Sequence, residues 1–363
     1  MRTSRLPAAV LAMLATAAAC SQKQEPSDQK PLIEDQPADK AAATPGAPVA
    51  GKKLFVYVSP DPLGVNPFLL MGKNGLETAA SKHGADVKVF ESEDPTTRRD
   101  NLRAAVDAGA TLVAVLGFQF NDIIVEFAEK HPEVDFLIVD QCVQTRPKNL
   151  HCAVFREHEP AFLLGAEAAA LSQKGLVGVV AAVDIPFMHR FTDGFAAGAR
   201  HVKPDIKVEV RWVGGPNPFS DPVRAKEQAL ALHAAGVDVL FSATSGGDFG
   251  IFEAAAEKDF RVMGVDMNHC PNAPGRMYDA ALKRLDTAMV EIIDSIAGGG
   301  EGLTASFGLA EGGGSLVALG EGDLAATQCL VAQHPEVVTL VRGLRDEIVS
   351  GKLAVQDPMS ARE

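Results

Sequence analysis

One segment of this sequence occurs twice with nearly the same pattern. The first copy contains "AEKHPEVDFLIVDQC" and the second contains "AEKDFRVMGVDMNHC". Gly109 and Asp140 bound the first copy, Gly236 and Asp266 bound the second, and the two spacings differ by a single residue. Each copy has the order glycine, strand, loop, helix and a second strand that ends in aspartate, which is one βαβ unit. A duplicated βαβ unit predicts two similar α/β halves.

Short apolar strands recur along the rest of the chain, with helical segments between them. The first half contains "LFVYVSP", "DVKVFES", "TLVAVLG" and "DFLIVD", and the second contains "VGVVAAV", "IKVEVRWV", "VDVLFSAT" and "RVMGVD". Strands that are apolar on both faces and alternate with helices are typical of parallel sheets covered by helices. The sequence therefore predicts an α/β protein with two doubly wound parallel-sheet lobes, joined near "HCAVFREHEPAF".

The N-terminus has the pattern of a secretory signal. Arg2 and Arg5 precede an apolar run over residues 6–19 that is too short to span a membrane. The three alanines before Cys20 resemble the bacterial lipobox, in which the cysteine is acylated and becomes the first residue of the mature protein. We therefore expect residues 1–19 to be a signal peptide and Cys20 to carry lipid. A plain signal peptide with a free thiol is the alternative.

The segment that follows predicts a tether between a membrane and a folded body. Residues 20–50 are rich in Gln, Pro, Asp, Lys and Ala and have almost no large apolar side chain, so they cannot order themselves. The remaining body is long enough for two lobes with cores and contains no second long apolar run. A net charge of −13 argues against nucleic acid as a partner. The expected location is the cell envelope, with a lipid anchor in the membrane.

The chain contains five cysteines. The four beyond Cys20 are an even number in an exported protein, which permits disulfides in three possible pairings. Cys142 with Cys152 is favoured because only a short segment joins them, and Cys270 with Cys329 then follows by elimination. Four buried free thiols are the alternative. No metal site is predicted, because neither Cys-x-x-Cys nor His-x-x-x-His spacing occurs.

The two aspartates that close the repeated strands are candidate ligand-binding residues. In parallel α/β sheets, ligands bind outside the carboxyl ends of the strands. Asp140 and Asp266 each sit at such an end, one in each half. If the halves face each other, both carboxylates point into a shared cleft. The alternative is that each aspartate caps the following loop or pairs with a nearby cation.

Phenylalanines follow several of the predicted strands. They are Phe68, Phe118, Phe120, Phe187, Phe219 and Phe249. Rings in loops over a cleft can stack on a flat ligand, although any single one of them is more often part of the packing. Phe68 and Phe219 are included among the predicted ligand-binding residues. Gly246 and Gly247 are included too, because glycines let backbone N–H groups approach a ligand closely.

Several motifs resemble one known family. They are "FREHEPAFLLGAEAAAL", "IPFMHRFTDGFAAGARHVKPDIKV", "AGVDVLFSATSGGDFG", "RVMGVDMN" and "LKRLD". In this order they resemble the basic membrane protein (BMP) family of substrate-binding lipoproteins, which includes purine nucleoside receptors of ABC importers. The resemblance implies a type I periplasmic-binding-protein fold with three crossings and a hinged cleft. It places residues 51–155 and 271–302 in lobe 1, and residues 156–270 and 303–355 in lobe 2.

The resemblance also implies roles for particular residues. Family members stack a base between aromatic rings and hold ribose hydroxyls with carboxylates. By motif, this implies stacking on Phe68, hydroxyl binding by Asp140 and Asp266, backbone contact near Gly246, and a further polar contact from Lys283.

These features favour a lipid-anchored receptor that captures a small polar ligand, in particular a nucleoside, and presents it to the permease subunits of an ABC importer. A ligand-sensing envelope lipoprotein that partners a signalling receptor is one alternative, and a sugar-binding protein of the same fold is another. An enzyme is not predicted, because no Ser-His-Asp order, Walker loop, GxSxG elbow or metal motif occurs. No cofactor is predicted.

Overall fold

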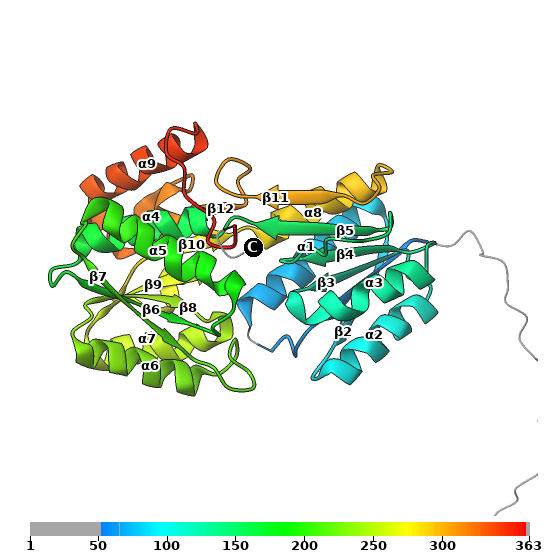
Figure 1. Cartoon of the computed structure of the whole chain (residues 1–363), viewed down its shortest axis with the longest axis horizontal. Helices are drawn as coiled ribbons and strands as arrows, with labels where there is room; N and C mark the ends of the chain where they lie inside the picture. Colours follow the sequence, from blue (N-terminus) through cyan, green and yellow to red (C-terminus); the bar gives the residue numbers. More distant parts are fainter. Residues whose placement is uncertain (1–51, 65, 361–363) are drawn as a thin grey trace, which may run out of the picture. The chain divides into compact units, whose positions relative to one another are not determined.

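The computed structural model describes residues 52–64 and 66–360. Within these ranges the strands form two six-stranded sheets, in the orders β11-β5-β4-β3-β1-β2 and β12-β10-β9-β8-β6-β7. Figure 1 shows each sheet with helices on both of its faces. We call the first sheet with its helices lobe 1, and the second sheet with its helices lobe 2. The predicted α/β fold with two doubly wound, mainly parallel sheets is confirmed.

Lobe 1 is built around a sheet whose strands all pair in parallel. Helices α1 and α8 pack on one face of this sheet, and α2 and α3 pack on the other. The elements are β1 (Leu54–Ser59), α1 (Pro67–His83), β2 (Asp86–Glu91), α2 (Pro95–Asp107), β3 (Leu112–Leu116), η1 (Phe118–Phe120), α3 (Asn121–Lys130), β4 (Asp135–Val139), β5 (Leu150–Phe155), α8 (Leu285–Ala297) and β11 (Thr304–Phe307).

Lobe 2 has the same layers, with α4, α5 and α9 on one face and α6 and α7 on the other. Its edge strand β12 pairs antiparallel with β10. The elements are α4 (His158–Leu171), β6 (Leu176–Ala181), η2 (Pro186–Met188), α5 (His189–Val202), β7 (Lys207–Trp212), α6 (Pro222–Ala235), β8 (Val239–Ala243), η3 (Ser245–Gly247), α7 (Asp248–Lys258), β9 (Arg261–Asp266), η4 (Cys270–Asn272), β10 (Met277–Lys283), β12 (Gly314–Leu316), η5 (Val317–Leu319), η6 (Leu324–Thr327), η7 (Leu330–Gln333) and α9 (Pro335–Val349).

The start of α1 is fixed by its capping residues. The Asn66 side chain accepts hydrogen bonds from the backbone N–H groups of Phe68 (3.1 Å) and Leu69 (3.3 Å), and Pro67 occupies the first turn. Asparagine caps free N–H groups well, and proline has no N–H to satisfy at this position. The cap places Phe68 in the first turn of α1, close to the carboxyl end of β1.

The connections between the lobes differ from those expected. Within the described residues the chain leaves lobe 1 after β5, returns after β10 and leaves again after β11. The family resemblance implied that the second and third crossings lie at residues 271 and 303. Instead, β10 pairs in parallel with β9 in lobe 2, and β11 pairs in parallel with β5 in lobe 1. Because β10 is largely buried, it needs neighbours on both sides, and β9 and β12 provide them.

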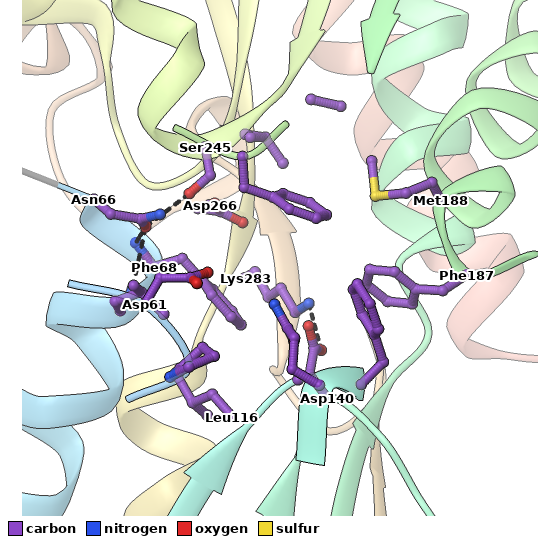
Figure 2. Close-up of a pocket in the computed structure, with 18 of the residues that line it drawn as sticks. Asp61, Asn66, Phe68, Leu116, Asp140, Phe187, Met188, Ser245, Asp266 and Lys283 are labelled. Atoms are coloured by element: carbon purple, nitrogen blue, oxygen red, sulfur yellow. Dashed lines mark hydrogen bonds and ion pairs between the residues drawn. The ribbon is translucent and has the colours of Figure 1, made fainter. Parts of the chain in front are cut away.

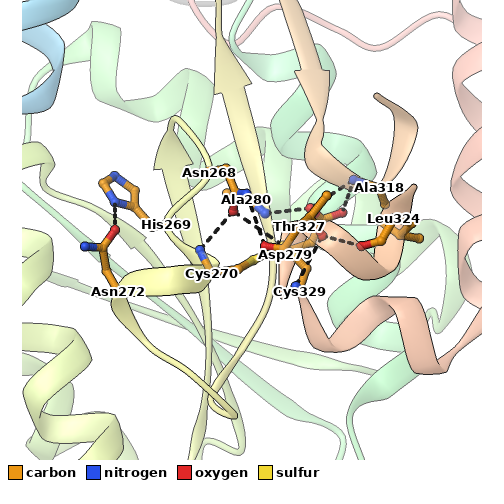
Figure 3. Close-up of a disulfide and its surroundings, with 10 residues drawn as sticks. All are labelled: Asn268, His269, Cys270, Asn272, Asp279, Ala280, Ala318, Leu324, Thr327 and Cys329. Atoms are coloured by element: carbon orange, nitrogen blue, oxygen red, sulfur yellow. Dashed lines mark hydrogen bonds between the residues drawn. A yellow bond between two sulfur atoms is a disulfide. The ribbon is translucent and has the colours of Figure 1, made fainter. Parts of the chain in front are cut away.

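Two disulfides join the same cysteine pairs that the sequence favoured. Cys142 is bonded to Cys152, and Cys270 is bonded to Cys329. Figure 3 shows the second bridge, which ties the loop after β9 to the segment before η7. Asn268 supports it by accepting a hydrogen bond from Cys270 N (2.9 Å). In the chain-entropy account, closing a loop of 59 residues stabilises the fold by roughly 4 kcal/mol.

The predictions for the N-terminus lie outside the described residues. These are the signal peptide over residues 1–19, the lipid on Cys20 and the tether over residues 20–50. In the part of the chain that the structure does describe, every helix is too short or too polar to cross a membrane.

Candidate ligand-binding site

A cavity lies between the two lobes, where the strands of both sheets end. Including the part open to solvent, the space between its lining atoms is about 680 Å³. Figure 2 shows side chains of both lobes pointing into it. The lining residues are Pro60, Asp61, Asn66, Phe68, Leu69, Leu116, Gly117, Phe118, Gln119 and Asp140 from lobe 1, and Phe187, Met188, Phe191, Phe219, Ala243, Ser245, Val265, Asp266 and Lys283 from lobe 2.

Asp140 and Asp266 occupy equivalent positions in the two lobes. Asp140 directly follows β4, and Asp266 is the last residue of β9. Both have a left-handed backbone conformation, with φ of 72° and 70°, which aspartate tolerates better than most residues other than glycine. Both are nearly buried, with exposed fractions of 9% and 7%. The matched strand ends thus place one carboxylate from each lobe at the cavity.

Lys283, the last residue of β10, brings an ammonium group into the cavity. Its Nζ lies 2.5 Å from Asp140 Oδ1 and 2.9 Å from Glu157 Oε1. Burial lowers the pKa of this ammonium group, but the carboxylates of Asp140, Glu157 and Asp266 outweigh burial and raise the pKa above its ordinary value. Lys283 therefore stays charged at any physiological pH.

Four phenylalanine rings surround the Lys283 ammonium group. Its Nζ lies 4.8 Å from the ring centroid of Phe68, 4.9 Å from that of Phe155, 5.2 Å from that of Phe187 and 5.8 Å from that of Phe191. A cation at such distances is attracted to the ring quadrupole. The four rings therefore help to hold the ammonium group in place, and those of Phe68, Phe187 and Phe191 also give the cavity wall flat apolar surfaces.

Asp266 differs from Asp140 because no cation is bound to it. Within the described residues it forms no ion pair, and the Ser245 side chain lies beside it. Burial raises the pKa of Asp266 to about 6, while Lys283 and the Ser245 hydroxyl act in the opposite direction. At neutral pH the carboxylate is therefore mostly ionised, and it can accept hydrogen bonds from a ligand.

A hydrogen bond joins the two lobes directly at the cavity. Ser245 Oγ, in η3 of lobe 2, donates to Asn66 Oδ1 in lobe 1 at 2.9 Å, and both groups are buried. Figure 2 shows this bond beside Asp266. Ser245 has φ of 55°, a conformation that is uncommon for serine and is found where the surrounding structure imposes it. The Asn66 amide oxygen thus both caps α1 and contacts the opposite lobe.

The structure brings most of the predicted site residues together, but not the two glycines. The predicted residues that line the cavity are Phe68, Asp140, Phe219, Asp266 and Lys283. Gly246 and Gly247 are not among the lining residues. A Cβ at Gly246 would lie 3.1 Å from the Phe219 carbonyl oxygen, and one at Gly247 would lie 2.8 Å from Thr244 Oγ1. Close packing within lobe 2 therefore explains both glycines.

The other phenylalanines divide between the cavity and the core. Phe118 and Phe187 line the cavity. Phe120 is fully buried in lobe 1, beneath α3. Phe249 packs edge-on against His269, with ring centroids 6.0 Å apart. Position after a strand therefore does not by itself show which rings reach the cavity.

Three residues at or behind the cavity were not anticipated from the sequence. Asn66 carries a usable signal, since an asparagine directly before a proline and an apolar run is a helix-capping pattern. Ser245 directly precedes Gly246 and Gly247, which were predicted as ligand-binding residues while Ser245 was not. Glu157 lies in "FREHEP", where four ionisable side chains suggest an exposed loop. Its burial against Lys283 is a tertiary effect without a local signal.

Two lobes of parallel sheet, joined by three crossings around a cavity, define a type I periplasmic binding protein. A solute-binding protein of an ABC transporter system from Aeropyrum pernix has this fold, with a TM-score of 0.73 at 24% identity over 84% of this chain and 93% of that one. The myo-inositol binding protein of Caulobacter, bound to myo-inositol, has a TM-score of 0.58 at 17% identity over 79% and 99%.

The chain belongs to the family described as "ABC transporter substrate-binding protein PnrA-like", which matches residues 52–324. This is a family of substrate-binding proteins rather than enzymes. Basic membrane protein A2 of Borrelia garinii is 28% identical over 214 residues, covering 58% of this chain and 62% of that protein. The ABC transporter nucleoside-binding protein BmpA of Lactococcus lactis is 31% identical over 174 residues, covering 48% of each. The chain therefore spans less than two thirds of the length of these relatives.

Proposed function

We propose that this protein is the extracytoplasmic, lipid-anchored binding protein of an ABC importer and that it binds a nucleoside between its lobes. The observation that carries the proposal is that Asp140 and Asp266, one from each lobe, line a cavity that several phenylalanine rings also line. Carboxylates accept hydrogen bonds from hydroxyl groups, and rings stack on flat bases. A nucleoside combines both kinds of group in one molecule.

The polar groups of the cavity have different roles in binding the ligand. Asp266 has no cation bound to it, so its oxygens are available to sugar hydroxyls. Lys283 donates hydrogen bonds to ligand oxygens, while Asp140 both orients Lys283 and accepts from the ligand. The base then lies against Phe68 or Phe219, which line the same cavity.

The lining of the cavity favours a nucleoside over a free sugar. Phe68, Phe187 and Phe219 line it, and a base has a flat face that can stack on such rings, which a free sugar does not have. The BmpA relative from Lactococcus lactis, named as nucleoside-binding, supports the same ligand class. Delivery to permease subunits is proposed from membership of the family, and the lipid anchor from the sequence around Cys20.

A thermal-shift screen tests the proposed ligand class. Purine and pyrimidine nucleosides, free bases, pentoses and hexoses are added separately to the purified protein. A ligand at one hundred times its Kd stabilises the folded state by about 2.7 kcal/mol, which raises the Tm measurably. We expect a nucleoside to give the largest shift. If a pentose or hexose raises the Tm and no nucleoside does, the protein binds a sugar instead. A search for permease genes beside this gene separates an importer from a sensor.

A further inference from the structure

Behind the cavity, five charged side chains alternate in sign from the ligand site to the C-terminal segment. Asp140 and Glu157 both contact Lys283, at 2.5 and 2.9 Å. The second oxygen of Glu157 lies 3.4 Å from Arg190 Nη1. Arg190 in turn binds Asp357 through two hydrogen bonds, of 3.0 Å from Nε and 2.6 Å from Nη2. The five side chains are at most 22% exposed, so solvent screens their interactions little.

Asp357 belongs to the segment that follows α9, and this segment is held firmly on lobe 2. Leu353 and Val355 pack against the core under α4 and α5. Asp357 Oδ1 also accepts a hydrogen bond from Met359 N at 3.0 Å. Figure 1 shows the segment after α9 running toward the side of lobe 2 that faces lobe 1. Residues 350–360 therefore end close to the first crossing of the chain.

Arg190 connects this segment to lobe 1. It lies on α5, and its Nη1 donates to the carbonyl oxygen of Phe155, the last residue of β5, at 2.9 Å. A guanidinium group that binds a carboxylate through two parallel bonds is fixed in orientation as well as in place. Asp357 therefore determines where the guanidinium group points, and so how strongly it attracts Glu157.

We propose that residues 350–360 belong to the binding apparatus, with Asp357, Arg190 and Glu157 acting as positioning residues for Lys283. When Asp357 loses its charge, the Arg190 guanidinium group has no partner carboxylate there and binds Glu157 more strongly. The ion pair between Glu157 and Lys283 then weakens. The ammonium group then shifts toward Asp140 and occupies oxygen atoms that would accept from the ligand. The family match ends at residue 324, so Asp357 lies outside the residues that define the family.

The first test observes Lys283 without any ligand. The full folded chain is labelled with ¹⁵N at its lysine side chains, and the Nζ resonance of Lys283 is assigned with Lys283→Arg. Asp357→Asn is expected to shift this resonance, and Asp357→Glu to return it toward the parent position. Asp346→Asn is the matched control, because the Asp346 side chain forms an exposed ion pair with Arg345 on α9, away from this network. An unchanged Lys283 resonance in folded Asp357→Asn would overturn the proposal.

The second test measures coupling to the ligand site, and it rests on the proposed function. Adenosine is titrated into the parent and into Asp357→Asn, Glu157→Gln and the double variant. Asp357→Asn is expected to weaken binding about five- to tenfold, within the usual range of coupling between sites. The effects of the two substitutions should be clearly non-additive, as for residues in one network. Equal affinity in Asp357→Asn and the parent would refute the coupling. If adenosine does not bind the parent, the nucleoside proposal fails. The proposal that Asp357 positions Lys283 is then still tested by the lysine resonance.

Discussion

At the scale of single residues, Asp140 and Asp266 meet two separate requirements. Their backbones are left-handed, with φ of 72° and 70°, and their carboxylates reach the cavity. Asparagine tolerates the same backbone conformation as aspartate but carries no charge. An Asp→Asn substitution therefore tests the carboxylate alone, whereas Asp→Ala would also disturb the turn that ends the strand.

Asp266→Asn should weaken ligand binding without weakening the fold. A charged hydrogen bond to a ligand hydroxyl contributes about 1.5 to 3 kcal/mol, so the Kd of the best nucleoside should rise tenfold or more. Because burial raises the pKa of Asp266 to about 6, the ionised carboxylate costs stability at neutral pH, and the Tm of the variant should not fall. Calorimetric titration and thermal unfolding measure the two effects.

The matched control for this substitution is Asp259→Asn. Asp259 is also left-handed, with φ of 56°, but it pairs with Arg261 and Arg276 on the exposed end of α7. The control should bind like the parent. If Asp266→Asn also binds every tested ligand like the parent, the carboxylate of Asp266 has no part in binding and serves only the turn.

A buried pair of carboxyl groups in lobe 2 should make stability depend on pH. Glu167 on α4 and Asp279 on β10 are both fully buried. Burial raises the pKa of both groups, that of Asp279 to about 7, and the negative charge of Asp279 raises the pKa of Glu167 further. A raised carboxyl pKa gives stability that is complete below the unfolded value, near 4, and is lost as the pH rises through the folded value.

Glu167→Gln should flatten this pH dependence. We expect the free energy of unfolding of the parent to fall between pH 5 and 8, by at most about 1.4 kcal/mol per pH unit for each proton. The variant should lose less over the same range, because glutamine does not titrate. Urea unfolding at pH 5 and pH 8 measures the difference, with Glu227→Gln on the exposed face of α6 as the control. Equal pH slopes for parent and variant would contradict the account.

The residues of the site could be predicted where the chain signals them locally. Asp140 and Asp266 end apolar strands, and such ends form ligand sites in parallel sheets. Phe68 follows the first predicted strand and was also implied by the family motifs, whereas Lys283 came from those motifs alone. Glu157 could not be found in this way, because its burial depends on contacts with Lys283 and Arg190 that lie far away in sequence. The two glycines were chosen for a role in binding, whereas packing alone accounts for them.

At the scale of elements, the contact between α4 and α5 depends on glycine. A Cβ at Gly198 would overlap the carbonyl oxygen of Phe162, and one at Gly165 would overlap that of Phe195. The two helix backbones can touch only because both side chains are absent. Since α5 also carries Arg190 and Phe191 to the site, this contact helps to position the cavity wall.

Gly198→Ala should therefore destabilise the protein even though alanine favours helices. Overpacking of this kind typically costs about 1 to 3 kcal/mol. Gly343→Ala provides a matched control, because Gly343 also lies within a helix, α9, but has open space around its Cα. The control should gain roughly 0.5 to 1 kcal/mol. Denaturant unfolding of both variants measures the contrast, and a stabilised Gly198→Ala would show that the helices can separate at no cost.

The repeated units were predictable as elements, whereas the connections between lobes were not. Apolar strands separated by helical segments identify β3, β4, β8 and β9 directly. The segment "MYDAALK" has the same apolar character and could extend either sheet. It belongs to lobe 2 because it pairs in parallel with β9. The local sequence does not show that β9 is its partner.

At the scale of the whole molecule, Cys20→Ala should release the protein from membranes. The prediction rests on the apolar run and the three alanines that precede Cys20. Several acyl chains on one cysteine anchor a protein stably, whereas a free chain without them has no comparable affinity for lipid. Fractionation of cells and labelling with a radioactive fatty acid measure the outcome. A variant that stays in the membrane fraction with undiminished label would rule out this cysteine as the anchor.

Closure of the two lobes should depend on the hydrogen bond from Ser245 to Asn66, because it joins the lobes beside the ligand site. Ser245→Ala removes a bond of about 1 kcal/mol between the lobes, so ligand affinity should fall about fivefold if this bond forms on closure. Small-angle scattering with saturating ligand should also give a larger radius of gyration than for the parent. Ser295→Ala, on the exposed face of α8, is the control. Unchanged affinity and radius in Ser245→Ala would mean that the ligand alone holds the lobes together.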